Sequence, residues 1–525
     1  MTKKFSEELR TFCETTSVRG IPRILKAKTR LMFFVWSLGV LTCAGVLAWQ
    51  IYVILSRYFQ YPVNTLTVQA PSWQTPPFPD ITVCNLSPLV YENQFKTAYK
   101  DYLDHVSSEL AKEIPLYEQA LKKGTNVSSD QVQAAADALH FFSEPTTYLN
   151  HFPIDATFSF TENESMVLDC AYFDWSGNLL KTNCLTNIYA AWDPTYYKCF
   201  TLTLNNSDRG NIRGMSAVLY IDEDDHTEDL QDFDLSMSVS QATGIRMRVH
   251  SGGVFPDFSQ GISLGPGTET SVLLNPSKKV RLAQPFSNCT MEQRLPGDEA
   301  KYTLHHCIVV CMQQHIINSC GCISSSVPQY STGQLREANL TICGNASRPD
   351  FYQSYACMSR LVADASVNTA CTNACVLPCN ELHYDAIPST APWPQASAQR
   401  AFFNTYIQNS ARLSQTFPTG PNSTEFIASR FLQLNVQFGD PASYTMLTDV
   451  AAFSVDAMGA QIGGVLSLGL GVTVMFAFEA FEFIYIYLTN CRQGEGSAGC
   501  DQAVSIGSSA SSTELAPQSV AVQVE

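Results

Sequence analysis

Two long apolar runs dominate the pattern of hydrophobic and polar positions along the chain. The first, residues 31–55, contains 25 residues without a charge, and at about 1.5 Å per helical residue it exceeds a hydrocarbon core of roughly 30 Å. The second, residues 463–488, is interrupted only by Glu479 and Glu482. We predict that each run forms a membrane-spanning helix. A cleaved signal peptide is the alternative for the first run, but its apolar region would be shorter and closer to the start of the chain.

The region between the two runs mixes strand and helix patterns. Alternating apolar and polar positions predict strands at residues 80–84, 217–221, 244–249 and 432–438. A periodicity of 3.6 residues predicts helices at residues 91–119, 130–142 and 302–317. Apolar residues continue upstream of the second run to Val450, which is too far for one straight span. We therefore assign residues 450–462 to the end of the intervening domain. Residues 489–525 lack a periodic apolar face and predict a disordered tail.

The charge distribution orients the chain. Residues 1–30 carry eight Lys or Arg against three Glu, a net charge of +5, and positively charged flanks stay in the cytoplasm. Two spans return the C-terminus to the same side. This predicts a multi-pass plasma-membrane protein with both termini cytoplasmic and residues 56–462 extracellular. Residues 31–488 carry a net charge of −18, an acidic field that raises the local cation concentration and opposes binding of nucleic acid.

Cysteines and sequons agree with an extracellular domain. Fourteen of the 18 cysteines lie between the two runs, and an even number in an oxidising compartment suggests seven disulfides, although spacing cannot choose the pairs. Zinc binding is the alternative for Cys320 with Cys322 and for the evenly spaced Cys371, Cys375 and Cys379. Six usable glycosylation sequons fall in the same region, at Asn126, Asn163, Asn205, Asn339, Asn345 and Asn422.

These observations define a fold class and exclude one class of function. We expect an α+β membrane protein in which two transmembrane helices flank a large disulfide-rich extracellular domain. The sequence contains no Walker loop, no G-x-S-x-G elbow and no H-E-x-x-H motif, so we expect no enzyme, no cofactor and no resident metal. A non-conducting membrane receptor or adhesion protein remains an alternative to a channel.

Several segments in order resemble the degenerin/epithelial sodium channel family, which includes acid-sensing and peptide-gated channels. They are FPDITVCN (78–85), YYKCFTLTLN (196–205), GMSAVLYID (214–222), the cysteine cluster and Trp393-Pro394. The resemblance implies an amiloride-sensitive, trimeric sodium channel subunit with a β-sheet palm and a helical thumb. It also implies seven disulfides, which are Cys84–Cys199, Cys170–Cys184, Cys289–Cys379, Cys307–Cys375, Cys311–Cys371, Cys320–Cys357 and Cys322–Cys343.

The resemblance also implies a selectivity filter in the second apolar run. The family has Gly-x-Ser followed by two acidic residues, eight and eleven positions after the glycine. An ungapped match places the filter at Gly471, Val472 and Thr473 and the acidic positions at Glu479 and Glu482. Threonine replaces serine, so ion discrimination can differ from that of relatives. Glycine lets three backbones approach and turn carbonyls toward an ion, whereas packing of two membrane helices is the alternative reading of small residues.

The two glutamates favour a pore. One acidic side chain in the middle of a membrane helix costs about 2.5 to 3.5 kcal/mol, so exposure of both to lipid is unfavourable. Glu479 and Glu482 are three residues apart and share a helix face; in a trimer this face would form carboxylate rings that attract cations. An internal salt bridge is the alternative, but neither run contains Lys or Arg.

Two further matches concern gating. Residues 17–24 (SVRGIPRI) match a segment that usually reads His-Gly, here Arg19-Gly20, and relatives use it in gating near the inner mouth of the pore. We hypothesise that Arg19 approaches the carboxylate ring; an ordinary juxtamembrane positive charge is the alternative. Tyr61 and Phe286 match an aromatic pair that couples thumb and pore in the family, and packing without a gating role is the alternative.

The stimulus and partners follow less directly. Acid-sensing relatives have histidines after the tyrosine, where this chain has Pro62 and Val63. We therefore rank a secreted peptide first, protons second and constitutive opening third. The acidic run 222–229 is either a solvated loop or a site for Ca²⁺ modulation or proton sensing. The expected partners are the lipid bilayer, permeant Na⁺ and two further subunits, identical or related.

Overall fold

The computed structural model describes the chain in two units. Described residues are 2–71, 74–86, 108, 166–180, 184–193, 195–221, 242–295, 300–324, 340–345, 351–410, 413–414, 424–440 and 444–493. Residues 1–64 and 451–525 form one unit, and residues 65–450 form the other. We call them the helical unit and the sheet unit. The predicted helices 91–119 and 130–142, the acidic run 222–229 and nearly all of the predicted tail lie outside the described residues.

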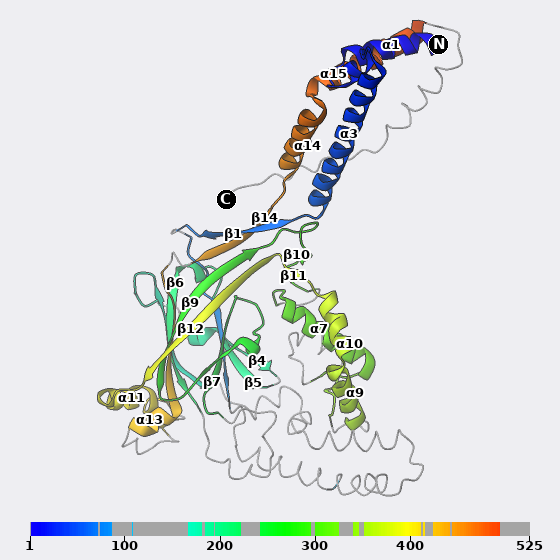
Figure 1. Ribbon diagram of the computed structural model, residues 1–525. Helices are drawn as coiled ribbons and strands as arrows, with labels where there is room; N and C mark the ends of the chain where they lie inside the picture. The colour runs from blue at the N-terminus through cyan, green and yellow to red at the C-terminus, as the bar shows by residue number, and fades with distance from the viewer. Residues whose placement is uncertain are drawn as a thin grey trace, which may run out of the picture. The chain divides into compact units, whose positions relative to one another are not determined.

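The helical unit is built around one long apolar helix. Its described elements are α1 (Thr2–Thr15), α2 (Ile21–Leu25), α3 (Arg30–Phe59), α14 (Val455–Leu470) and α15 (Val474–Gln493). The side chain of Thr29 starts α3 by accepting a hydrogen bond from Met32 N–H at 3.3 Å. The helix contains the predicted run 31–55 and is longer at both ends. In Figure 1, α3 and α14 lie side by side.

Length and composition let α3 cross a membrane. None of its most apolar 18-residue window is buried inside the protein, and its large side chains face outward, with Leu31, Phe34, Leu38, Leu41 and Trp49 all at least 65% exposed. A core helix of a water-soluble protein would bury this surface. Among the described residues, α14 and α15 pass the same test only as a pair, bent by 75° at a short break.

The second apolar run differs from its prediction at both ends. Helix α14 begins at Val455, where the side chain of Ser454 accepts a hydrogen bond from Ala457 N–H at 3.2 Å. Residues 455–462 therefore belong to the same helix as the predicted start at 463, whereas residue 450 lies in the strand β14 (Thr445–Ala451) of the sheet unit, as predicted. The boundary of the second span stays a prediction. The apolar pattern is continuous there, and a serine cap fixes where the helix starts.

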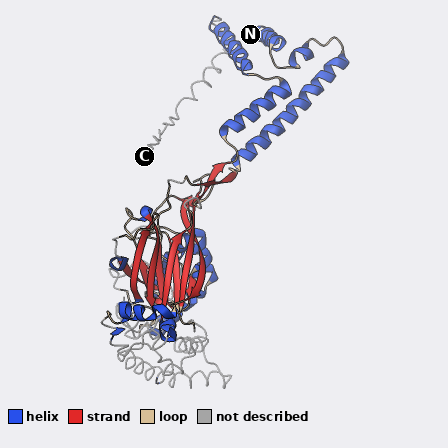
Figure 2. Ribbon diagram, turned by 90° about the vertical axis from the view of Figure 1, so that its left-hand side faces the viewer, coloured by secondary structure: helices blue, strands red, loops and turns tan. Residues whose placement is uncertain are grey.

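The sheet unit contains two main sheets. A seven-stranded sheet has the order β1-β14-β9-β13-β6-β3, with β12 also paired to β9, and a five-stranded sheet has the order β4-β5-β2-β7-β8. Their strands are β1 (Val63–Gln69), β2 (Asp80–Asn85), β3 (Val167–Asp174), β4 (Ile188–Asp193), β5 (Tyr197–Leu202), β6 (Ile212–Tyr220), β7 (Ile245–His250), β8 (Ile262–Leu264), β9 (Thr268–Val280), β12 (Asn380–Pro392), β13 (Phe431–Phe438) and β14 (Thr445–Ala451). Figure 2 shows these strands in red. The four predicted strands correspond to β2, β6, β7 and β13.

The strand β9 organises the larger sheet. It pairs with β12 in antiparallel register from Asn380–Val280 to Pro392–Thr268, while β13 and β14 run parallel to successive parts of it. Every residue of β2 is buried, because β2 lies between β5 and β7 and its apolar side chains join the core. That core takes residues from both sheets, including Ile81, Phe200 and Val436.

The helices of the sheet unit form a disulfide-bonded group. This group is α7 (Leu304–Cys320), α9 (Phe351–Ala363) and α10 (Ala365–Ala374), which lie together in Figure 1 beside the short strands β10 (Cys289–Thr290) and β11 (Leu377–Pro378). Helix α7 corresponds to the predicted helix 302–317. The remaining described helices are short: η4 (Cys184–Asn187), η5 (Arg209–Asn211), η7 (Phe258–Gln260), η8 (Ala396–Ala398), α11 (Gln399–Phe402), η9 (Phe403–Ile407) and α13 (Thr424–Arg430).

The structure forms the seven disulfides that the resemblance implies. Five of them bind the helix group and its base, and two bind strands: Cys289–Cys379, Cys307–Cys375, Cys311–Cys371, Cys320–Cys357, Cys322–Cys343, Cys84–Cys199 and Cys170–Cys184. Cys311, His315 and Cys371 lie close enough to hold a metal ion. Both of these cysteines are oxidised in one disulfide, so they offer no thiolate to zinc.

Candidate functional site

The predicted filter residues form the break between α14 and α15. Gly471 ends α14 with φ 68° and ψ 24°, a left-handed conformation that costs other residues roughly 1 kcal/mol or more. Its N–H donates to Ser467 O at 3.0 Å, and Val472 N–H donates to Leu466 O at 3.2 Å. Thr473 is exposed, and its carbonyl accepts from Phe476 N–H at 3.0 Å. The glycine is therefore required for the local backbone.

Residues 16–20, which we call the N-terminal loop, contact this break. Arg19 N–H donates to Leu470 O at 2.8 Å, and a Cβ placed on Gly471 would lie 2.9 Å from Arg19 Cγ. Gly20 has φ 106°, and a Cβ there would lie 2.6 Å from Val40 Cγ2 on α3. The structure therefore brings together three residues that the sequence singled out, Arg19, Gly20 and Gly471.

The two glutamates of α15 have different surroundings. One carboxylate oxygen of Glu479, Oε2, accepts hydrogen bonds from Thr16 Oγ1 and from Ser17 N–H, each at 3.0 Å. Glu482 is exposed, and within the described part of the chain it has no recorded ion pair or side-chain hydrogen bond. Nor is an ion pair recorded there between Arg19 and either glutamate, because Arg19 extends along Gly471 instead.

Aromatic rings reinforce the contact between the chain ends. The ring centroid of Phe12 lies 5.0 Å from that of Phe483 and 6.3 Å from that of Phe476. Sequence reasoning did not select Phe12, Thr16 or Ser17. The only signal was their position directly before Arg19-Gly20, since a Thr-Ser pair is common and the contact joins residues 463 positions apart.

Tyr61 and Phe286 lie in different units. Tyr61 has φ 47°, and its ring centroid lies 5.9 Å from that of Tyr58 and 6.4 Å from that of Phe59. Phe286 is half-buried in the sheet unit. Coupling between them stays a prediction.

The described sequons differ in exposure. Asn205 is exposed, as a glycan acceptor must be. Asn345 is only 9% exposed, so we no longer consider it an acceptor; a sequon does not reveal burial. Asn126, Asn163, Asn339 and Asn422 lie outside the described residues.

A buried ion pair lies beneath a cleft in the sheet unit. Arg209 Nη2 lies 2.6 Å from Asp80 Oδ1, with side chains 8% and 1% exposed. The guanidinium also donates to Phe78 O at 2.9 Å and to Thr203 Oγ1 at 3.0 Å. The second oxygen of Asp80 accepts from Gly253 N–H at 3.0 Å. This network joins β2, η5 and the loop after β7.

Next to this network, His250 is buried and neutral. Its Nε2 lies 2.8 Å from Thr82 Oγ1, which lies 2.7 Å from Thr201 Oγ1. Burial disfavours the charged imidazolium and lowers the pKa of His250 from 6.5 to about 4. The side chain therefore stays uncharged until strongly acidic pH.

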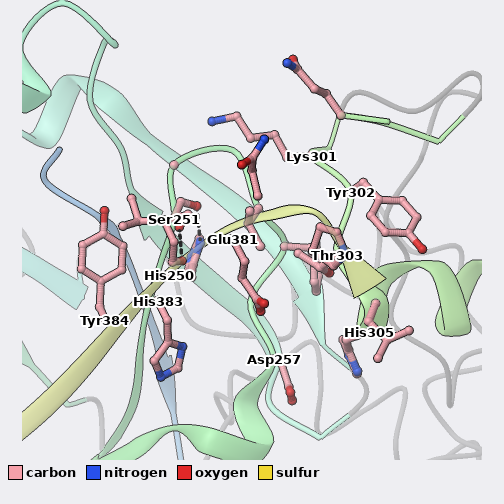
Figure 3. A pocket seen from close by; sticks show the side chains of 18 of the residues that line it. His250, Ser251, Asp257, Lys301, Tyr302, Thr303, His305, Glu381, His383 and Tyr384 are labelled. Atoms are coloured by element: carbon pink, nitrogen blue, oxygen red, sulfur yellow. Dashed lines mark hydrogen bonds between the residues drawn. The ribbon is translucent and has the colours of Figure 1, made fainter. Parts of the chain in front are cut away.

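A cleft of about 830 Å³ opens above these residues. It lies between the end of β7, the start of α7 and the start of β12, and Figure 3 shows Lys301 at its top with Asp257 and His305 at its bottom. Arg248 lines it and bonds only neutral acceptors among the contacts recorded there, Gln260 O at 3.0 Å and Gln260 Oε1 at 2.9 Å. The cleft thus presents cationic groups beside an acidic one.

Comparison with known proteins gives a consistent result. A family model described as amiloride-sensitive sodium channel matches residues 12–483. The human bile acid-sensitive ion channel is 23% identical over 92% of this chain and 86% of its own length. The FMRFamide-activated amiloride-sensitive sodium channel of Cornu aspersum is 23% identical, covering 89% and 81%. The epithelial sodium channel subunit gamma of Xenopus laevis is 22% identical, covering 91% and 80%.

Proposed function

Because the chain belongs to the amiloride-sensitive sodium channel family, we propose that it is one subunit of a trimeric plasma-membrane channel that conducts Na⁺ passively. The observation that carries this proposal is the glycine break at 471–473 inside an apolar helix pair, followed by two glutamates. A receptor or adhesion protein needs an ectodomain and an anchor. It has no need for this costly arrangement within lipid.

The proposed topology has two spans. Helix α3 is the first, and the bent pair α14 and α15 is the second. The outward-facing apolar side chains of α3 support its role as a span. The excess of positive charge before α3 supports the orientation, with both termini in the cytoplasm and residues 65–450 outside.

The proposed pore is formed by the break at residues 471–473 and by the exposed carboxylate of Glu482. The carbonyl groups of Gly471 and Val472 accept no recorded hydrogen bond in the described part of the chain, so they can replace part of the hydration shell of a cation. Three copies of the exposed Glu482 would form an acidic ring that concentrates cations near the inner end. Additions of a Cβ at Gly463 and Gly464 meet nothing within 4 Å among the described residues, which leaves room for close approach of neighbouring subunits.

We further propose that an extracellular ligand opens the channel and that the cleft in the sheet unit receives it. A ligand there would touch both the first turn of α7 and the strands β7 and β12, so it would bias their relative positions. Two of the relatives are named for a molecule that acts on them, one as bile acid-sensitive and the other as FMRFamide-activated. A secreted peptide is the first candidate, because Lys301, Arg248 and Asp257 offer both charge signs; protons are second.

The test is a recording from cells that express the full chain. Currents are measured in Na⁺ and then in the impermeant cation N-methyl-D-glucamine, while FMRFamide, a bile acid and acid are applied in turn and amiloride is added last. We expect an inward Na⁺ current that disappears in the large cation and is blocked by amiloride. The variant Glu482→Gln should lower the single-channel conductance, with Asp385→Asn in the sheet unit as an unaffected control. Surface-labelled protein that carries no Na⁺ current under any condition, alone or with related subunits, would favour the receptor alternative.

A further inference from the structure

The N-terminal loop places a permanent charge beside the proposed filter. We propose that Arg19 is a specificity-determining residue that excludes divalent cations from the pore, and that Glu479 is the positioning residue that holds the loop in place. This inference rests on the proposed channel function. It adds a role for each residue beyond the rings of Glu479 and Glu482 that would attract cations in a trimer.

The loop is held at several points. Thr16 Oγ1 and Ser17 N–H both bond Glu479 Oε2 at 3.0 Å, and Arg19 N–H bonds Leu470 O at 2.8 Å. Thr16, Val18 and Gly20 are buried, whereas Arg19 is exposed. The backbone is therefore fixed on both sides of Arg19, and its side chain lies across Gly471.

The charge of Arg19 lies close to the break. The positions of its Cγ, Cδ and Nε are 2.9, 3.1 and 3.4 Å from a Cβ built on Gly471. A guanidinium stays protonated at all physiological pH values, and no ion pair of Arg19 is recorded in the described chain. A trimer would place three such charges near the narrowest backbone. Because Coulomb energy is proportional to the ion's charge, Ca²⁺ experiences twice the repulsion of Na⁺ at the same place.

The chemistry of Glu479 separates anchoring from attraction of cations. A glutamine at 479 keeps an amide oxygen that can accept both hydrogen bonds from the loop, but it carries no charge. A leucine accepts neither bond. If Glu479 acts as an anchor, Glu479→Gln preserves the position of Arg19 and Glu479→Leu does not. If it acts as a ring charge, both substitutions reduce cation attraction alike.

The experiment measures the Ca²⁺ to Na⁺ permeability ratio from reversal potentials of the full-length channel in inside-out patches. We expect Arg19→Gln to raise this ratio on the order of tenfold and Arg19→Lys to leave it nearly unchanged. Arg19→His should make the ratio depend on cytoplasmic pH, low at pH 5.5 and high at pH 8, because imidazole titrates near 6.5. The wild type should show no such dependence, and a merely structural role of Arg19 would produce none.

The anchor is tested in the Arg19→His background. Glu479→Leu and Thr16→Val should weaken the pH dependence, whereas Glu479→Gln should retain it. Thr15→Val is the matched control for Thr16→Val, because the hydroxyl of Thr15 donates to the main-chain carbonyl of Thr11 at 2.9 Å and makes no recorded bond to Glu479 in the described structure. A conducting wild type whose ratio is unchanged by Arg19→Gln, or an Arg19→His channel that ignores pH, would overturn this inference alone. A wild type without Na⁺ current would overturn the channel function as well.

Discussion

Replacement of Asp80 by asparagine should destabilise the sheet unit strongly. The substitution preserves the shape of the side chain but removes its charge. Arg209 then keeps a guanidinium that is 8% exposed and loses the negative charge 2.6 Å away. The remaining acceptors, Phe78 O and Thr203 Oγ1, are neutral and do not compensate a buried cation.

The expected magnitude follows from this burial. Removing one partner of a buried ion pair costs about 3 to 5 kcal/mol, mostly because the other charge stays desolvated. Since both side chains are under 10% exposed, solvent screening does not reduce this value much. The double variant Asp80→Leu with Arg209→Met removes both charges. It should therefore lose less stability than the sum of the losses measured for Asp80→Leu alone and Arg209→Met alone.

The assay is thermal unfolding of the full-length protein in detergent, followed by tryptophan fluorescence at a fixed heating rate. We expect the midpoint of Asp80→Asn to fall by roughly 5 °C or more. Asp385→Asn makes the same chemical change in an ion pair with His383 whose side chains are 46% and 66% exposed, and its midpoint should stay within error. Equal midpoints for Asp80→Asn and wild type, or strict additivity in the double variant, would refute the reasoning.

Three further predictions concern the break, the buried histidine and a disulfide. Gly471→Ala adds about 1 to 2 kcal/mol of left-handed strain and a Cβ 2.9 Å from Arg19, so Na⁺ current per surface-labelled channel should fall several-fold. Because the folded pKa of His250 is about 4 against 6.5 for the free side chain, wild type should lose up to about 3 kcal/mol of unfolding free energy as pH falls from 6.5 to 4, measured by denaturant titration; His250→Gln should lack this loss. Replacing Cys320 and Cys357 by serine opens a loop of 37 residues and should cost about 2 to 5 kcal/mol in the same assay, whereas Cys13→Ser should not.

The long apolar helix and four of the strands were predictable from the pattern of apolar positions in the sequence. The run 31–55 has no charge and is longer than the apolar region of a signal peptide, so it favours a membrane-spanning helix; the structure has a helix there from Arg30 to Phe59. Short alternating runs located β2, β6, β7 and β13 to within five residues of their observed bounds, because successive side chains of a strand point to opposite faces of the sheet. The disulfide pairs did not follow from spacing, since fourteen cysteines permit many pairings; the family resemblance supplied them.

Long-range polar contacts were not predictable. Asp80 begins a strand and reads as a solvent-facing end, yet Arg209 binds it from 129 positions away. The start of α14 at Val455 depends on one hydrogen bond from Ala457 N–H to the side chain of Ser454, which an uninterrupted apolar pattern does not reveal. The contact of Thr16 with Glu479 depends on two chain ends meeting, and no local pattern encodes that meeting.

The two glutamates of α15 show why identical residue types in one apolar segment need not share a role. A carboxylate in such a segment requires water, a counter-charge or several neutral donors, because its desolvation is otherwise prohibitive. Glu479 is bound by neutral donors, the hydroxyl of Thr16 and the N–H of Ser17. Glu482 has no counter-charge among the described residues, so water is the solution left to it, and water inside the proposed second span requires a conduit. The cation pathway is therefore better argued from Glu482 than from Glu479, even though the sequence presents the two as equivalent.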